Sequence, residues 1–152
     1  MHSKSRFRSR SDHTLDSKGR LIFPSRFRDV LQKFDSDILM ITIWGKHLRA
    51  FPMAEWELLE TKLIAQGKEK PELSNVVRLI VSSVTECTLD KQGRILLPPT
   101  LRSEINLRKD VVLMGMLDWV EIWDKDSWDV EHKEIQENPE NFQEKLSQLG
   151  MF

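Results

Sequence analysis

The sequence lacks most of the residues and patterns that identify enzymes and metalloproteins. It has a single cysteine, Cys87, so no disulfide can form within the chain. Four scattered histidines (His2, His13, His47 and His132) show no metal-ligand spacing among themselves or with that cysteine. Phosphate-binding loops, dinucleotide-binding loops and serine-hydrolase elbows are also missing. We therefore expect no enzyme, no catalytic residue, no metal site, no cofactor and no small-molecule substrate.

Long apolar runs are missing as well. No stretch of the sequence is apolar for long enough to span a membrane, and the basic N-terminal stretch lacks the apolar segment of a signal peptide. Apolar residues make up 39% of the 152 residues and charged residues 31%, a balance typical of a globular protein with a core. We expect a cytoplasmic protein with no membrane partner.

The net charge of −1 conceals a strong difference between the two ends of the chain. Residues 1–28 hold eight lysines and arginines against two aspartates, whereas residues 118–152 hold three lysines against ten acidic residues. This asymmetry indicates a polyanion-binding end and an acidic tail, and two oppositely charged solvated faces are the alternative. The two ends could also attract each other between subunits.

One ten-residue pattern occurs twice, 74 positions apart. The stretch LDSKGRLIFP at 15–24 returns as LDKQGRILLP at 89–98, with Asp16 and Arg20 matching Asp90 and Arg94. The glycine of each copy supplies the positive φ angle of a tight turn, and the aspartate can accept hydrogen bonds from backbone N–H groups across it. The repeat predicts two related halves, each too small to be stable alone, that pair with each other or between subunits.

The residues around both motifs predict the same elements in each half. Apolar runs at 38–44 and 48–51, and again at 110–116 and 119–123, predict two hairpins, each followed by a helix. Short helices are expected after Pro24 and Pro98, and an apolar helix over 73–84 should join the halves after a charged break at 67–71. Beyond Lys133 we expect a polar, acidic and mobile tail.

Basic residues near the first motif favour nucleic-acid binding. Lysines and arginines on projecting turns contact DNA phosphates, and the planar arginine side chain can also read guanine edges in the major groove. The first turn carries Lys18 and Arg20, while the second offers Lys91 and Arg94 among neutral and acidic neighbours. If residues 6–10 form a strand, their three arginines would share one face, and a frayed end is the alternative.

The two motif copies and several other segments resemble the MraZ family of bacterial regulators. The stretches HTLDSKGRLIFPSRFR and TECTLDKQGRILLPPTLR carry the doubled D-x-x-x-R motif of that family. FPMAEW, VRLIVSSVTEC, VVLMGM and VEIWDKDSW extend the resemblance over most of the chain. The sequence departs from the family at Ser9 and Ser82, where members often have glycine.

The resemblance implies an α+β fold of tandem AbrB-like swapped-hairpin β-barrel halves with flanking short helices. It places a first AbrB-like domain at 1–53, connecting helices at 54–82, a second AbrB-like domain at 83–130 and an acidic C-terminal tail at 131–152. It further implies a ring-shaped homo-oligomer, associated with the nucleoid, that binds double-stranded DNA. The expected targets are short direct repeats in the promoter of its own division and cell-wall gene cluster, where it acts mainly as a repressor.

By the same resemblance, Arg20 and Arg94 are the motif arginines, Arg28 matches a DNA-contacting arginine of AbrB proteins, and Asp16 and Asp90 orient the loops. The expected DNA-binding residues are Arg6, Arg8, Arg10, Lys18, Arg20, Arg28, Lys91 and Arg94. We expect the first copy to make most of the contacts, because it lies among arginines in the sequence. The alternative, of a different class, is an oligomeric protein-interaction scaffold without specific DNA binding.

Overall fold

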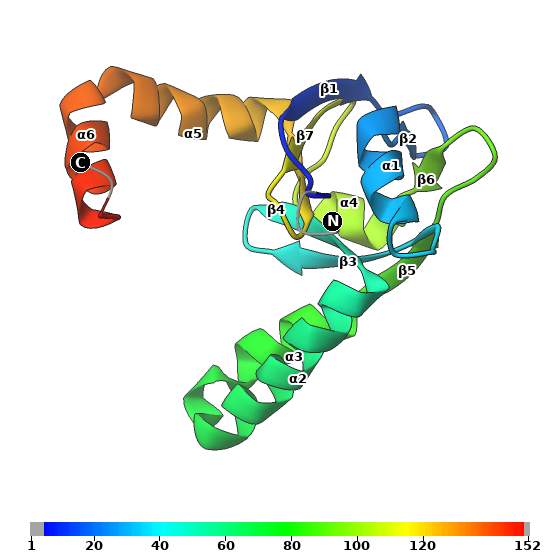
Figure 1. Ribbon diagram of the computed structural model, residues 1–152, viewed down its shortest axis with the longest axis horizontal. Helices are drawn as coiled ribbons and strands as arrows, with labels where there is room; N and C mark the ends of the chain where they lie inside the picture. The colour runs from blue at the N-terminus through cyan, green and yellow to red at the C-terminus, as the bar shows by residue number, and fades with distance from the viewer. Residues whose placement is uncertain (1–4, 151–152) are drawn as a thin grey trace.

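The structure is a computed structural model that describes residues 5–150 and has a mixed α+β architecture (Figure 1). The elements up to residue 69 are β1 (Arg10–Thr14), β2 (Arg20–Ile22), α1 (Ser25–Gln32), β3 (Ile38–Trp44), β4 (His47–Pro52) and α2 (Met53–Glu69). Those that follow are the 3-10 helix η2 (Pro71–Leu73), α3 (Ser74–Ser83), β5 (Thr85–Thr88), β6 (Arg94–Leu96), α4 (Pro99–Glu104), β7 (Asp110–Gly115), β8 (Val120–Asp124), α5 (Lys125–Glu137) and α6 (Pro139–Gln148). The expected α+β class and both hairpins, β3–β4 and β7–β8, are confirmed.

The two halves of the chain exchange strands. A six-stranded antiparallel sheet has the order β1–β7–β8–β4–β3–β5. In this order β1 from the first half pairs with the hairpin of the second half, and β5 from the second half pairs with the hairpin of the first. The remaining strands, β2 and β6, form a separate two-stranded ribbon that contains one strand from each half. Each hairpin therefore takes its outer strand from the other half of the chain.

An approximate two-fold symmetry relates the halves. Arg49 of β4 pairs with Glu121 of β8, which is the equivalent residue 72 positions later. In the ribbon, Leu21 pairs with Ile95, the equivalent residue 74 positions later. Because each of these residues faces its own counterpart, the symmetry axis passes through both pairs. The axis therefore runs through the centre of the ribbon, with one repeated motif on either side.

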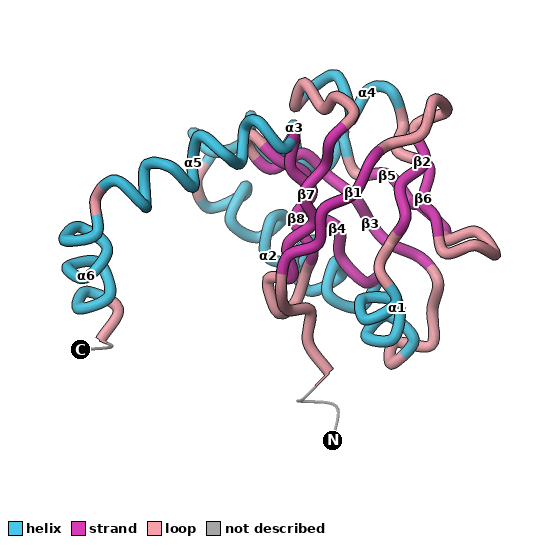
Figure 2. The backbone as a smooth tube through the Cα atoms, turned by 90° about the horizontal axis from the view of Figure 1, so that it is seen from above, coloured by secondary structure: helices cyan, strands magenta, loops and turns pink. Residues whose placement is uncertain are grey.

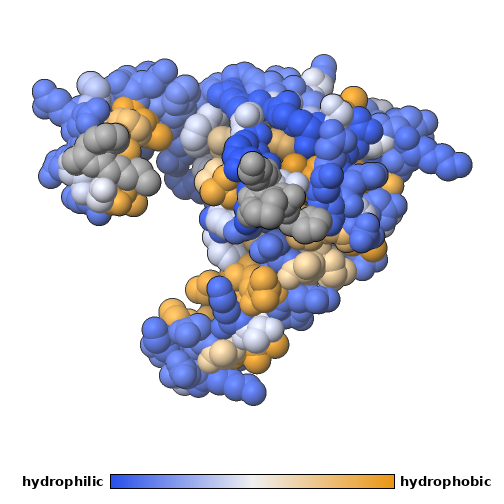
Figure 3. Space-filling view, in the orientation of Figure 1, coloured by the Kyte–Doolittle hydropathy of each residue, from blue (hydrophilic) through white to orange (hydrophobic). Residues whose placement is uncertain are grey.

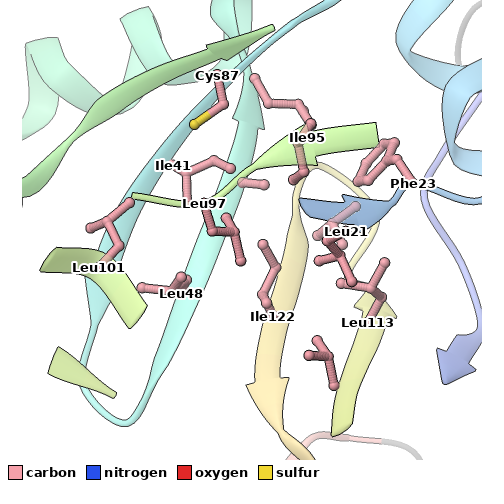
Figure 4. Packing of buried hydrophobic residues seen from close by; sticks show 14 of the residues in the cluster. Leu21, Phe23, Ile41, Leu48, Cys87, Ile95, Leu97, Leu101, Leu113 and Ile122 are labelled. Atoms are coloured by element: carbon pink, nitrogen blue, oxygen red, sulfur yellow. The ribbon is translucent and has the colours of Figure 1, made fainter. Parts of the chain in front are cut away.

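The larger of two apolar clusters joins the ribbon to the large sheet (Figure 4). Leu21 and Ile95 of the ribbon and Leu113 and Ile122 of the sheet have no exposed surface. Burying one such side chain stabilises a fold by about 1.5–3 kcal/mol. Since the core side chains come from both halves, the halves bury this core together, and the ribbon is anchored by its inner face.

Two helical extensions leave this body in different directions (Figures 1 and 2). The α2–α3 hairpin is more continuous than expected, because α2 runs on to Glu69 and the break contains Lys70 and the short η2. The segment after Lys133, expected to be polar and acidic, is helical and lies in α5 and α6, and its mobility stays a prediction. Ion pairs one helical turn apart, such as Lys133 with Glu137 at 3.7 Å, favour α5, and Pro139 begins α6.

Candidate nucleic-acid interface

The first D-x-x-G-R motif forms a tight turn immediately before β2. Gly19 has a φ angle of 83°, and its backbone N–H donates to the Asp16 carbonyl at 3.0 Å. The Asp16 carboxylate accepts hydrogen bonds from the backbone N–H groups of Lys18 (2.9 Å) and Arg20 (2.8 Å). Its second oxygen accepts from Nε of Arg20 at 2.5 Å. One carboxylate therefore holds both the backbone of the turn and the arginine side chain.

The second motif repeats this geometry before β6. Gly93 has a φ angle of 76°, and Asp90 accepts from the backbone N–H groups of Gln92 (2.9 Å) and Arg94 (2.8 Å) and from Arg94 Nε (2.9 Å). One contact differs, because Arg94 Nη2 also donates to the Gln92 side chain at 3.3 Å. Gln92 is the counterpart of Lys18. The second turn therefore has one positive charge fewer at this position and a more restrained arginine.

The hydrogen bonds of the turns lower the pKa of both motif aspartates. The backbone N–H of Arg20 is the largest cause, and with the Arg20 side chain and the Lys18 N–H it lowers the pKa of Asp16 to about 2. The backbone N–H of Arg94 is the main cause that lowers the pKa of Asp90. A carboxylate that accepts several N–H groups is stabilised in its ionised form. The geometry supports the expected orienting role of both aspartates.

The motif arginines lie on the outer face of the β2–β6 ribbon. In its register Arg20 pairs with Leu96, and Ile22 pairs with Arg94. The middle residue of each strand is buried, and alternate residues of a strand point to opposite faces, so these four side chains share the outer face. Figures 1 and 2 show the ribbon on the side of the body away from α6. The structure thus brings Arg20 and Arg94 together on one surface.

The strand exchange places each turn against an arginine of the other half. A Cβ atom on Gly19 would lie 2.8 Å from Cζ of Arg102, and one on Gly93 would lie 2.6 Å from Nη1 of Arg28. The sequence places Arg28 near the first turn, but the structure packs it on the second. Arg102, which is absent from the expected site, takes the equivalent place beside the first turn. Arg102 follows the second motif at the same offset at which Arg28 follows the first, and this match is the sequence signal that could have identified it.

The other neighbours of the two turns differ in charge. Beside the first turn, the backbone N–H of Leu15 donates to the carbonyl of Lys109 at 2.8 Å. Beside the second, the N–H of Leu89 donates to the carbonyl of Asp37 at 2.9 Å, and Asp29 lines the same hollow. The first turn therefore has Arg102 and Lys109 as neighbours, whereas the second has Arg28 together with Asp29 and Asp37, all supplied by the opposite half.

The N-terminal arginines occupy a different part of the molecule. Ser9 has a φ angle of 80°, which interrupts the expected strand over residues 6–10, so that β1 begins only at Arg10. Phe7 is buried and bridges to Leu117 at the tip of the β7–β8 hairpin. The expected alignment of three arginines on one strand face is therefore wrong. These arginines lie at the end of β1 opposite the first turn.

Arg6 and Arg10 of the N-terminal segment form ion pairs with nearby aspartates. Nε of Arg6 lies 3.5 Å from a carboxylate oxygen of Asp118, and Nε of Arg10 lies 2.7 Å from one of Asp12. Arg8 is exposed between them. Exposed ion pairs are worth at most about 1 kcal/mol, so a phosphate can compete for these side chains. The N-terminal segment thus forms a second basic region, separate from the ribbon.

Chemistry of other kinds has little support in the described residues. They contain no group of three or more histidine, cysteine or acidic side chains that could hold a metal ion. Cys87 is buried in β5, and burial raises the pKa of its thiol to about 11, which makes it a poor nucleophile at neutral pH. None of the helices within residues 5–150 is long and apolar enough to cross a membrane.

The geometry defines a class of protein: a chain of two repeated halves that presents a pair of arginine-bearing turns on one ribbon. Comparison with known proteins names the family. The sequence model of the MraZ protein matches residues 7–79 and again residues 80–149. The chain belongs to the MraZ family and contains two MraZ repeats.

Curated relatives support this assignment along nearly the whole chain. The protein from Syntrophobacter fumaroxidans is 43% identical over 145 residues, which cover 95% of this chain and 97% of the relative. That from Desulforapulum autotrophicum is 40% identical over 147 residues, covering 95% and 99%. Both are named transcriptional regulator MraZ. The resemblance seen in the doubled motif is confirmed, and the family is one of regulators, not enzymes.

Proposed function

We propose that the chain is a sequence-specific DNA-binding regulator that acts mainly as a repressor of its own division and cell-wall gene cluster. It binds short direct repeats in the promoter through the loops that carry the D-x-x-x-R motif. The observation that carries this proposal is the pair of matching turns that hold Arg20 and Arg94 on one ribbon face. The regulator names of relatives at 43% and 40% identity support it.

Each half is proposed to be an AbrB-like swapped-hairpin domain of a β-barrel type, and the strand exchange between the halves supports this. The segments are then a first domain at 1–53, connecting helices at 54–82, a second domain at 83–130 and an acidic C-terminal segment at 131–152. Residues 1–4 and 151–152 of these segments lie outside the described residues. Strand β1 of the first domain completes the sheet of the second, and strand β5 of the second domain completes the sheet of the first.

The candidate DNA contacts fall into two groups. The ribbon group lies around the two turns and consists of Lys18, Arg20, Arg28, Lys91 and Arg94, to which the structure adds Arg102. The N-terminal group consists of Arg6, Arg8 and Arg10. The N-terminal group lies at the end of β1 away from the first turn. It is therefore proposed to contact phosphates that flank the bases under the ribbon. Phosphate contacts of this kind add affinity without reading sequence.

A ring-shaped homo-oligomer is proposed to present several ribbons to successive repeats in the DNA. Exposed apolar side chains on α2 and α3 support association between copies, and Figure 3 shows apolar surface over this helical hairpin. Leu58, Val76 and Leu79 are 62%, 55% and 47% exposed. Several linked sites raise overall avidity without any new contact. A cytoplasmic, nucleoid-associated location follows from the same proposal.

The proposal is tested by fluorescence anisotropy with a duplex spanning the region upstream of the gene and a shuffled duplex of equal composition. The wild type should bind the upstream duplex more tightly, and R20A/R94A should lose most of that preference. Arg78→Ala is the matched control, since this exposed arginine lies on α3 and pairs only locally with Ser74 and Asn75. Equal binding to both duplexes, with an unchanged oligomer, would favour the scaffold alternative.

A further inference from the structure

Two aliphatic side chains lie between the motif arginines on the outer face of the ribbon. Ile22 is 51% exposed and Leu96 is 58% exposed. Ile22 faces Arg94 across the ribbon, and Leu96 faces Arg20. Directly opposed side chains in an antiparallel pair have Cβ atoms about 4.5–5.5 Å apart, and diagonal neighbours about 7–8 Å. The aliphatic pair therefore forms one diagonal of a small four-residue patch, and the arginines form the other.

The fold does not account for apolar side chains at these two positions. The core under the ribbon is filled by the buried middle residues, Leu21 and Ile95. A strand with one solvated face usually alternates apolar residues inside with polar residues outside. Both repeats nevertheless carry a branched aliphatic residue two positions after the motif arginine, while the nearby position of Lys18 holds a glutamine in the second repeat. This shared feature points to a ligand that both halves contact in the same way.

The chemistry of the patch matches the floor of the DNA major groove. That groove is wide enough for a two-stranded β-ribbon, its guanine edges accept two hydrogen bonds from arginine, and its apolar group is the C5-methyl of thymine. The flanking arginines make a polyanion the better occupant. Two side chains are also far too little surface for a protein interface, which buries roughly 800 Å² on each partner.

We propose that Ile22 and Leu96 select thymine in the target DNA by packing on its methyl group, between guanines contacted by Arg20 and Arg94. This inference rests on the proposed DNA-binding function and names base-reading residues within it. It implies that each ribbon prefers a site in which thymines lie between two guanine-containing base pairs. The two halves would read related sequences, because the patch is symmetric about the axis of the ribbon.

The test uses the upstream duplex prepared with thymidine or, in every position, with 2′-deoxyuridine, which lacks only the methyl group. The full-length wild type should bind the deoxyuridine duplex more weakly, by about fourfold for each methyl group that is buried. The variant I22S/L96S should bind both duplexes with nearly equal affinity. Val130→Ser is the matched control, because it removes an aliphatic residue that is 62% exposed from α5 and should keep the wild-type ratio.

The results separate this inference from the proposed function. Tighter binding to the upstream duplex than to the shuffled one, with no effect of deoxyuridine, would overturn the thymine contact and leave the DNA-binding function standing. No preference for the upstream duplex would overturn both. If I22S/L96S unfolds, I22V/L96V shortens each side chain in a strand-compatible way and should lower the ratio. If folded I22S/L96S keeps the wild-type ratio of the two affinities, the assignment to these residues is refuted. The assignment is also refuted if I22S/L96S loses oligomer mass but still prefers the thymidine duplex.

Discussion

The two D-x-x-G-R turns share their internal geometry and differ in their surroundings. In both turns the arginine N–H donates to the aspartate at 2.8 Å, and the glycine φ angles are 83° and 76°. Arg102 and Lys109 lie beside the first turn, whereas Arg28 and Asp37 lie beside the second. Five residues are enough to build the turn, but the charge around it depends on which strands pair. Matching motifs therefore need not contribute equally to one surface.

Removal of the motif arginines should have the largest effect. Arg20→Ala is expected to weaken binding to the upstream duplex by about 1–3 kcal/mol, the usual value of an arginine–guanine contact. Arg94→Ala should cost less, because Gln92 already holds one of its terminal nitrogens and Asp29 and Asp37 line the hollow beside its turn. Anisotropy titrations at one salt concentration measure both. If Arg94→Ala weakens binding as much as Arg20→Ala or more, the residues around the turns do not decide which turn contributes more affinity.

The strand exchange predicts which arginines act together. In double-mutant cycles on DNA affinity, Arg20 and Arg102 should couple by about 0.5–3 kcal/mol, because both belong to the first turn. Arg20 and Arg28 should be additive to within about 0.5 kcal/mol, since Arg28 packs on the second turn. The cycle for Arg94 with Arg28 is the symmetric control. Coupling of Arg20 with Arg28 alone would contradict the observed pairing of the halves.

A charge exchange between the turns should have a smaller effect. Lys18→Gln places at position 18 the residue that the second turn has at position 92, and Gln92→Lys does the reverse. If Lys18 contacts a phosphate, its loss should lower the slope of log affinity against log salt by about 0.9, and the reverse change should raise it. Lys70→Gln, far from the ribbon on the α2–η2 connection, serves as the control. Identical slopes for all variants would exclude a phosphate contact at this position.

The smallest expected effect concerns acid stability. Because the folded-state pKa of Asp16 is about 2, below its ordinary value of 3.8, its contribution to stability is present above pH 3.8 and is lost as pH falls toward 2. Asp90 shifts in the same direction, so its contribution is also lost in acid. Asp16→Asn should flatten the fall of Tm below about pH 4. A profile that follows the wild type at every pH would contradict the assignment.

Local patterns predicted most of the elements. Alternating and continuous apolar runs located both hairpins, and glycine and aspartate spacing located both turns, because these structures depend on neighbouring residues. The errors occurred where longer-range contacts decide. Ser9 adopts a positive φ angle where Phe7 packs at the β7–β8 hairpin tip, and this interrupts the expected strand. The helix after Lys133 has a local cause instead, since ion pairs one turn apart favour α5 and Pro139 begins α6.

The amino-acid pattern alone is enough to identify the family, the two-repeat organisation and the four motif residues Asp16, Arg20, Asp90 and Arg94. The residues that surround each motif are known only from the folded chain. No local pattern shows that β1 belongs to the second hairpin or β5 to the first, because such pairing follows from burying a core shared by both halves. That exchange brings Arg102 to the first turn and Arg28 to the second, and it exposes Ile22 and Leu96 between the motif arginines.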